Sequence, residues 1–366
     1  MTYLKYILFA GIMCTFASCH REDGPLELPE GKPIGLSTKI ENSNLIKSGE
    51  DTSLDIFIDK NIVVWGNFTT SEGTTAVFGE NGTRVYADYT GSEGNRSFSG
   101  WSYRPQQFWQ YEKYYFASVA PATLFNVTHS WDNTTPETTK AGYGYFDNST
   151  GITLDFGENG YDLSGGQDDI MAAFSDEIDN TDNDAEEMET GVGLNFFHQL
   201  SLVSIQAANM EENVDIQITS IKVYGNSSTA TEITITPATD EDGNIITAIT
   251  STLKGKTTED NPFKTFEYTS TEGSLPKKTG TENEFSTLVD GLIVFPEECD
   301  SFFLEVKYKV NGLETEYTKT GYLPVNWETG KKYTYQFTIS LDKMSFGTPT
   351  VEPWGDSKEI GNEIEM

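Results

Sequence analysis

Residues 302–312 read FFLEVKYKVNG, and this stretch decides the fold class of the chain. Apolar side chains recur at every second position from Phe302 to Val310, and Glu and Lys occupy most positions between them. Successive side chains of a β-strand point to opposite faces, so this period predicts a strand with one buried face. Asn311-Gly312 follows directly, and it is the strongest short signal for a hairpin turn. We expect the return strand at residues 313–320.

The same period of two occurs elsewhere along the chain. Residues 333–341 alternate between large apolar and polar side chains. Ile233 and Ile235 precede a turn signal at Asp242-Gly243, and a second apolar stretch begins at Ile245. Short strands separated by turn residues predict an all-β protein built from antiparallel β-sandwiches.

Helical signal is scarce. Residues 168–174, DDIMAAF, predict one or two helical turns, with Asp168 or a neighbour as the N-cap. Residues 176–189 contain eight acidic and no basic side chains. A calcium-binding EF-hand frame that starts at Asn180 places Ala185 and Gly191 where Gly and Glu are required. The acidic run is therefore interpreted as a solvated loop.

The chain has 366 residues, which is long enough for two domains. The boundary is expected near residue 190, because an apolar strand over residues 192–205 begins just beyond the acidic run. We expect a signal peptide, a proline-containing tether and two domains. Their ranges are 1–18, 19–32, 33–190 and 191–366.

Charge and motif content exclude several classes of function. The chain has 24 Lys and Arg against 57 Asp and Glu, a net charge of −33. Nucleic acid binding needs a basic surface, so nucleic acid is not an expected partner. The sequence contains no phosphate loop, dinucleotide fingerprint or nucleophile elbow, and His198 is interpreted as a hydrogen-bonded structural residue. No catalytic residue, metal site or cofactor is expected, and the protein is not interpreted as an enzyme.

Aromatic side chains are concentrated in residues 101–115. They are Trp101, Tyr103, Phe108, Trp109, Tyr111, Tyr114 and Tyr115. Two interpretations stay open: they fill a sandwich core and its edge, or they form a platform on which sugars stack. The core interpretation is favoured.

The N-terminus reads as a targeting signal. Lys5 precedes an apolar run over residues 6–17, which is shorter than the stretch of about 20 residues that spans a membrane. The run ends in FASC, so that Cys19 resembles the lipidated cysteine of a bacterial lipobox. An ordinary secretory signal with a chance cysteine is the alternative. A lipid on Cys19, such as palmitate, predicts a surface-exposed lipoprotein of the outer membrane.

Several segments, in this order, resemble the fimbrillin family, the type V pilins of Bacteroides-type bacteria. The first contains Trp101 and Trp109 and continues to an aromatic strand that ends at Pro121. The others are DIMA at residues 169–172, VGLNFFHQLSLVSI at 192–205, WETGKKYTYQFTI at 327–339 and VEPW at 351–354. The third departs from the family pattern, because Asn195 and two adjacent Phe precede its His.

The resemblance implies two transthyretin-like β-sandwich domains, secretion as a lipoprotein and assembly into fimbriae by donor-strand exchange. In that process a protease removes the first strand, here residues 34–40, after Lys or Arg, and a C-terminal strand of another subunit fills the groove. Lys47 and Lys39 are the candidate cleavage sites. Residues 343–354 form the candidate donor strand, which Pro349 and Pro353 limit in length. Its candidate apolar anchors are Met344, Phe346, Val351 and Trp354.

The expected function is therefore a structural or accessory subunit of fimbriae with a role in adhesion. Its partners would be other fimbrial subunits, the outer membrane through a lipid, and a host protein or glycan. A monomeric, surface-bound, glycan-binding lipoprotein that uses Trp101 and Trp109 is the alternative.

Overall fold

A computed structural model describes residues 31–40, 61–92, 95–110, 112–124, 143–158, 160–163, 169–224, 229–239, 245–253, 266–268, 274–279 and 283–354. Within these ranges the helices are the single-turn α1 (Glu187–Thr190) and the 3-10 turn η2 (Ala122–Leu124), and the rest is strand, turn or loop. The all-β prediction is confirmed. None of the described helices has the length and apolar character needed to cross a membrane.

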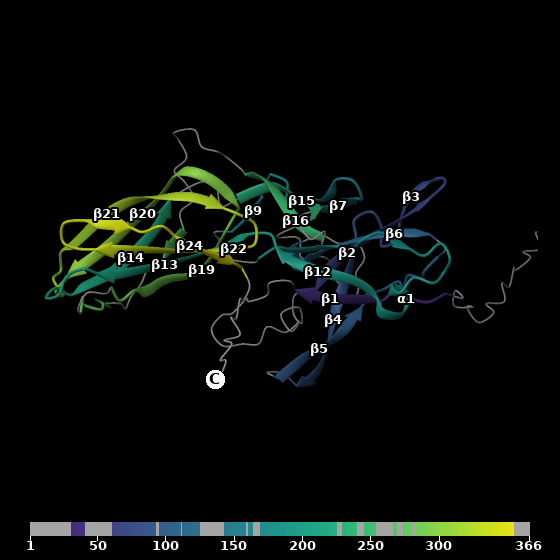
Figure 1. The fold of residues 1–366 in the computed structure, drawn as a ribbon, viewed down its shortest axis with the longest axis horizontal. Coiled ribbons are helices and arrows are strands. Elements are labelled where there is room, and N and C mark those ends of the chain that lie inside the picture. The colour runs from purple at the N-terminus through teal and green to yellow at the C-terminus, as the bar shows by residue number, and fades with distance from the viewer. Residues whose placement is uncertain are drawn as a thin grey trace, which may run out of the picture.

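The largest sheet has nine strands and occupies one end of the molecule (Figure 1). Its order is β1-β12-β10-β6-β2-β4-β5, with β11 paired to β6 and β3 paired to β2. The bounds are β1 Leu36–Ile40, β2 Ile62–Thr70, β3 Gly73–Ala76, β4 Thr83–Ser92, β5 Asn95–Ser102, β6 Lys113–Ala120, β10 Met171–Phe174, β11 Ile178–Asp179 and β12 Val192–His198.

The central strands of this sheet are buried on both faces. In β2, Ile62 and Val64 belong to one apolar core, and Val63 and Trp65 belong to another. A strand covered on both faces is a continuous apolar run rather than an alternation of apolar and polar residues. The nine-stranded sheet therefore separates two cores.

The prediction of a helix at residues 168–174 is wrong for the same reason. Met171–Phe174 is strand β10, hydrogen-bonded between β6 and β12, and all four of its side chains are buried. Met171 faces one core and Ala172 the other. A short apolar run without alternation cannot be assigned to strand or helix from periodicity alone.

The nine-stranded sheet curls until its two ends approach each other. Residues of β1 approach β5, although the two strands lie at opposite ends of the hydrogen-bonded order. Just after β5, Phe108 forms an isolated antiparallel bridge with Pro33, just before β1. The sheet thus forms an almost closed wall around one apolar core, and β1 lies at the seam.

Two five-stranded sheets enclose a further core at the opposite end of the molecule (Figure 1). One sheet has the order β19-β13-β22-β23 with β24 on β22, and the other has the order β17-β14-β20-β21 with β18 on β14. The bounds are β13 Ser201–Asn209, β14 Ile216–Tyr224, β17 Phe266–Tyr268, β18 Ser274–Leu275, β19 Ser286–Val294, β20 Glu297–Val310, β21 Glu316–Trp327, β22 Lys331–Ile339, β23 Met344–Phe346 and β24 Thr350–Pro353.

The hairpin predicted from residues 302–312 is present. Strands β20 and β21 pair antiparallel, and Asn311 and Gly312 between them have positive φ angles of 50° and 69°. Both central residues of a type I′ hairpin turn need such angles, which Asn and Gly accept at low cost. The return strand begins at Glu316, later than predicted, and ends at Trp327. The alternation predicted over residues 333–341 holds from Tyr333 to Ile339, where every second side chain of β22 is buried, but Leu341 lies beyond the strand and is 48% exposed.

A third five-stranded sheet contains residues from both sides of position 190. Its order is β16-β15-β8-β7, with β9 on β15, and β15 pairs with both β8 and β16. The predicted pairing of the Ile233 and Ile245 segments is thereby confirmed, and the turn between them lies outside the described residues. The bounds are β7 Tyr143–Asp147, β8 Gly151–Asp155, β9 Tyr161–Asp162, β15 Thr229–Thr239 and β16 Ile245–Leu253.

The apolar stretch over residues 192–205 forms two strands rather than one. The chain leaves the nine-stranded sheet after β12, passes through Gln199 and Leu200, and enters another sheet as β13. Strands on both sides of residue 190 therefore share sheets. The division into tandem sandwich domains stays a prediction.

Candidate functional site

The segment that contains β1 is held by backbone hydrogen bonds on both sides. On one side β1 runs parallel to β12, from the pair Leu36–Val192 to the pair Ile40–Phe196. On the other side Ile34 donates its N–H to Gln107 O at 2.9 Å. Trp109 likewise donates to Lys32 O at 3.0 Å. Residues 32–40 thus occupy a slot in the wall, and their removal leaves unpaired backbone groups on β12 and on the segment around Gln107.

Alternate side chains of this segment point into the enclosed core. Ile34 is 1% exposed and Thr38 is 8% exposed. The Tyr103 hydroxyl donates to Ile34 O at 2.7 Å, and Trp101 Nε1 donates to Thr38 Oγ1 at 3.1 Å. Burial raises the pKa of Tyr103 from 10 to about 12, still further above neutral pH, where the hydroxyl is protonated and donates. The slot therefore recognises an apolar side chain, a backbone carbonyl and a small hydroxyl.

Three members of the aromatic cluster are buried and do not form an exposed platform. Tyr103, Trp109 and Tyr114 are buried in the core beneath β1. The ring centroids of Trp109 and Tyr114 lie 4.9 Å apart in an edge-to-face arrangement. Phe108, Trp101 and Tyr115 are half-buried, and Tyr111 lies outside the described residues. The core interpretation of this cluster is confirmed for its three buried members, and those three are not available for stacking on a sugar.

The candidate donor segment pairs with β22 as two short strands, β23 and β24, at the edge of the sheet. β23 pairs with Phe337–Ile339 and β24 pairs with Lys331–Thr334, both antiparallel. Pro349 lies between the pieces and Pro353 ends the second, as expected for a residue that has no N–H to donate.

The four predicted anchors of this segment differ in burial. Met344 and Phe346 are half-buried and pack on the core between the two C-terminal sheets. Val351 is 50% exposed, whereas Trp354 is 1% exposed. Three of the four therefore contribute to the fold of their own chain.

Phe346 closes over a glycine on the facing sheet. A Cβ atom built on Gly321 in β21 would lie 2.0 Å from Cε2 of Phe346. No side chain larger than hydrogen fits at Gly321 unless the Phe346 ring moves. Gly321 thus allows β23 to lie close to β21.

Trp354 packs on a buried histidine at the end of β12. The two rings are stacked, with centroids 4.5 Å apart and an interplanar angle of 10°. His198 Nδ1 lies 2.5 Å from Asp169 Oδ2, and both of these side chains are buried. Trp354 N–H donates to Gly330 O at 2.6 Å. His198 is thus the hydrogen-bonded structural residue that the sequence analysis expects. Its partners were missed, because Asp169 and Trp354 are far from it in sequence and no local pattern marks them.

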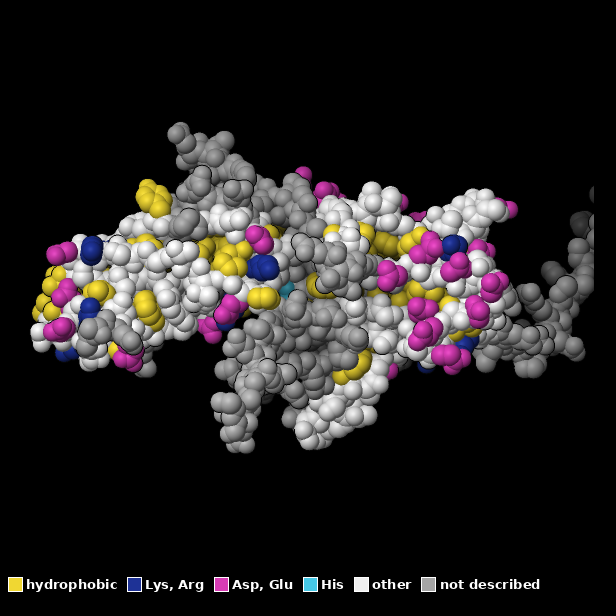
Figure 2. All heavy atoms as spheres, viewed as in Figure 1, with side chains coloured by type: hydrophobic (Ala, Val, Ile, Leu, Met, Phe, Trp, Pro, Cys, Tyr) yellow, Lys and Arg dark blue, Asp and Glu magenta, His cyan; other side chains and the backbone are white. Residues whose placement is uncertain are grey.

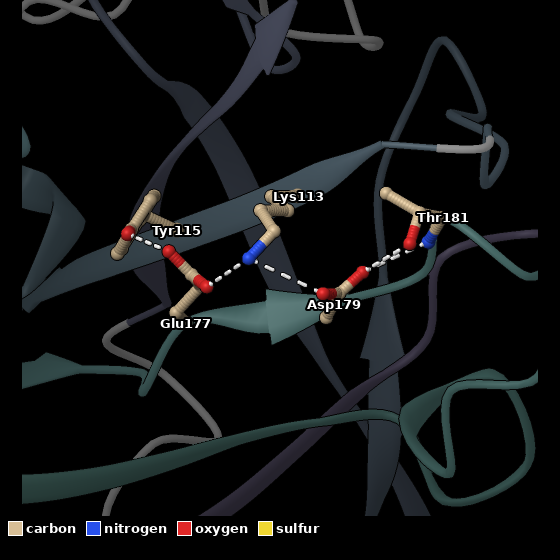
Figure 3. Close-up of polar contacts among 5 residues, drawn as sticks. All are labelled: Lys113, Tyr115, Glu177, Asp179 and Thr181. Atoms are coloured by element: carbon tan, nitrogen blue, oxygen red, sulfur yellow. Dashed lines mark hydrogen bonds and ion pairs between the residues drawn. The ribbon is translucent and has the colours of Figure 1, made fainter.

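Acidic side chains gather at the end of the molecule that carries α1 (Figure 2). Lys113 on β6 lies between two of them, 2.7 Å from Glu177 and 3.2 Å from Asp179 (Figure 3). Tyr115 donates its hydroxyl to Glu177, and the Thr181 hydroxyl donates to Asp179 at 2.6 Å. The hydrogen bonds from Thr181, followed by that from Lys113, lower the pKa of Asp179 to about 2.

Polar contacts of this acidic region join neighbouring elements of the fold. Lys113 and its two acidic partners join β11 to β6, and Asn180 donates its side-chain N–H to Gln110 O at 2.8 Å. Across the described ranges, no three His, Cys, Asp or Glu side chains are grouped so that they could hold a metal ion. Lys32 forms an ion pair with Glu189, which ties the start of the β1 segment to α1.

The predicted processing sites are described only in part. The backbone of Lys39 lies inside β1, paired with Asn195 of β12. Cleavage at Lys39 would therefore require the strand to open first. Cys19 and Lys47 lie outside the described residues.

A family model described as fimbrillin-like matches residues 58–354. No curated protein matches the chain. Among solved structures, the chain is similar to a putative cell adhesion protein from Parabacteroides distasonis, with 10% identity, a TM-score of 0.46, and coverage of 89% of this chain and 98% of that chain. It is also similar to a fimbrial assembly protein from the same species, with 12% identity, a TM-score of 0.38, and coverage of 87% and 99%. The fimbrial anchor protein Mfa2 from Porphyromonas gingivalis shows 11% identity, a TM-score of 0.28, and coverage of 88% and 98%.

Proposed function

The chain belongs to the fimbrillin-like family, and from this membership we propose that it is a structural or accessory subunit of a cell-surface fimbria, assembled by strand exchange. The observation that carries the proposal is the position of β1. The strand itself pairs with β12, and the residues just before it, Lys32 and Ile34, bond to the segment around Gln107, so that together they fill a slot between these two neighbours. Such a slot, once emptied, is the template on which an added strand gains affinity from the backbone and specificity from alternate side chains.

Cleavage changes the exchange equilibrium without changing any contact in the slot. While the chain is intact, β1 is held at the high effective concentration of an intramolecular ligand. After a cut beyond β1, at Lys47, the strand dissociates as a separate peptide, and a strand from another subunit competes for the slot. A cut at Lys39 would leave part of β1 on each fragment, so Lys47 is the favoured site.

The donor in this proposal is the segment that contains β23 and β24. It lies on one edge of β22 only, and its two pieces have three and four residues. Its release costs the burial of Met344, Phe346 and Trp354, which the slot of the next subunit would have to replace. An edge strand of this kind is easier to exchange than a central strand, because only one neighbour is lost.

We further propose that the subunit reaches the outer membrane as a lipoprotein acylated at Cys19 and contributes to adhesion to a host protein or glycan. Radiolabelled palmitate should be incorporated by the unmodified chain and not by the Cys19→Ala variant. Incorporation in that variant would remove Cys19 as the lipid site and favour the ordinary secretory signal.

Controlled proteolysis tests the exchange step. The purified chain should remain monomeric until a trypsin-like protease cuts after Lys47, and multimers should then appear by size-exclusion chromatography. Lys47→Ala should keep the chain intact and monomeric under the same digestion. A cut chain that lacks residues 343–366 should not form multimers, because it has an empty slot but no donor.

Mass spectrometry of the mature N-terminus on cells gives the complementary result. A start just after Lys47 would support a polymerising subunit. A start at an acylated Cys19, with no shorter form, would contradict cleavage and leave the roles of an anchor subunit or a glycan-binding lipoprotein. A cut chain that loses β1 but stays monomeric would overturn strand exchange itself.

A further inference from the structure

Strand β12 contacts both segments that must move during strand exchange. Its residues from Val192 to Phe196 pair with β1. Its last residue, His198, carries the ring on which Trp354 is stacked. The slot and the C-terminal segment, far apart in sequence, are therefore joined by one short strand.

The first five residues of β12 have β1 as their strand partner. On its other edge, β12 pairs with β10 only through Phe197–Ala172 and His198–Met171. Val192, Leu194 and Phe196 are fully buried in the core that β1 covers. Loss of β1 therefore removes the ladder along most of β12 and opens its apolar face to water. A strand left with two paired residues is expected to fray.

The C-terminal end of β12 carries His198, the residue against which Trp354 packs. Asp169 holds the His198 ring at 2.5 Å, and Gly330, which accepts from the Trp354 N–H, itself donates to Leu200 O at 3.0 Å. The indole thus stacks on the last residue of β12, and the Trp354 backbone is joined through Gly330 to the link that follows this strand. Fraying of β12 would move the surface against which the Trp354 ring packs.

The contact between Trp354 and His198 carries a cost that makes its release easier. Within the described part of the chain, Trp354 Nε1 and His198 Nε2 are buried without a hydrogen-bond partner. A buried polar atom without a partner carries a desolvation cost, which partly offsets the gain from stacking. The side chains of β24 itself are all exposed, so Trp354 is the buried contact at that end of the segment.

We propose that β12 couples the two ends of the chain, so that a seated β1 favours a seated Trp354, and loss of β1 favours release of the C-terminal segment. This inference rests on the proposed function, in which β1 leaves and that segment becomes a donor. It adds an order to assembly: a subunit releases its donor after its own slot has been opened. In this coupling Trp354 and His198 position the C-terminal segment against the end of β12.

Hydrogen exchange of the intact chain tests the coupling without any assembly. Ile34→Ala weakens β1, and we expect the amides of residues 350–354 to exchange at least about fivefold faster, the lower end of typical coupling between sites. Ile62→Ala is the matched control, because Ile62 is fully buried in the same core but lies on β2. It should leave exchange at residues 350–354 unchanged. If Ile34→Ala fails to fold, Ile34→Val with Ile62→Val gives the same contrast at smaller amplitude.

Coupling between two sites is reciprocal, so the reverse experiment must agree. Trp354→Ala should accelerate exchange of the β1 amides by a similar factor. Phe346→Ala is the control, since Phe346 belongs to the same segment but packs on Phe337, with ring centroids 5.7 Å apart, and over Gly321. It should accelerate exchange in β23 and leave β1 unchanged.

Unchanged exchange at residues 350–354 in Ile34→Ala, or an equal increase in Ile62→Ala, would overturn the coupling. The proposed function can fail independently. Coupling with no multimers after cleavage would contradict strand exchange only, whereas multimers without coupling would contradict this inference only.

Discussion

The two ends of the described chain are held in opposite ways. The β1 segment bonds to the chain around Gln107 through Lys32 and Ile34 and to β12 through residues 36–40, so its contacts are spread along its length. The C-terminal segment is bonded on one side in two pieces, and its deepest contact is a single side chain, Trp354. The difference teaches that the β1 segment depends on many backbone bonds to two neighbours, whereas the C-terminal segment has one neighbouring strand and depends most on the burial of Trp354.

The largest expected effect on the free energy of unfolding comes from truncating Trp354. Trp354→Ala should lower the free energy of unfolding by about 3–5 kcal/mol, the usual range for a buried aromatic side chain. Val351→Ala in the same segment should change it by less than about 0.5 kcal/mol, because Val351 is half exposed. Urea denaturation of both variants measures the contrast. Equal effects would show that the segment is held along its length, like β1.

A smaller effect is expected where β23 meets the facing sheet. Gly321→Ala places a methyl group where the Phe346 ring lies, and overpacking of this kind costs about 1–3 kcal/mol. Gly193→Ala is the matched control, because a Cβ atom at that position of β12 meets no atom within 4 Å. Thermal unfolding should separate the two glycines. A neutral Gly321→Ala would mean that Phe346 does not hold β23 against β21.

On the β1 side, single contacts should matter less. Thr38→Val keeps the shape of the side chain but removes the acceptor of the Trp101 N–H, which should cost about 0.5–1.5 kcal/mol. The Trp101 indole proton in an NMR spectrum should shift in the same variant. Ser37→Ala, on the exposed face of β1, should leave both the stability and that proton unchanged. A cost above that of Trp354→Ala would reverse the comparison between the two ends.

The smallest effect concerns pH, and it acts on the nine-stranded sheet that contains β1, not on the sheet that contains β24. The folded-state pKa of Asp179 is about 2, below its ordinary value of 3.8. The stability that this carboxylate contributes is therefore fully present above pH 3.8 and is lost as the pH falls toward about 2. In this pH range the backbone amides that pair β11 with β6 should exchange faster, whereas those of β24 should not change. Hydrogen exchange measures both. Thr181→Val should bring the pKa of Asp179 closer to 3.8 in a carboxyl NMR titration, and an unchanged value would exclude Thr181 as the main cause.

The sequence predicts best those strands that have one face in a core and the other exposed to solvent. Tyr333, Tyr335 and Phe337 alternate with polar residues because β22 has a core on one side only, so its period is visible in the chain. Met171–Phe174 was predicted as a helix because both faces of β10 are buried and no period remains. The stretch over residues 192–205 failed differently, since its apolar character continues while the chain changes sheet at Gln199 and Leu200.

The candidate site was predictable only in its parts. The β1 segment and the four C-terminal anchors were identified from their patterns and family resemblance, and the structure describes where they lie. The pairing of β1 with β12, and the contact of Trp354 with His198 and Asp169, join residues that are distant in sequence. Contacts of that kind depend on the whole topology, and local periodicity carries no information about them.

The parallel pairing of β1 with β12 has a consequence for the order of folding. About 150 residues separate the two strands, and at ordinary rates of synthesis β12 follows β1 by on the order of ten seconds or more. The first strand of the described chain is thus among the last to find its strand partner, since contacts across long loops form slowly. Until then the edge of β12 is open in every newly made chain. A chaperone that covers exposed strand edges would meet the same surface on which, in the proposed function, a strand of a neighbouring subunit binds.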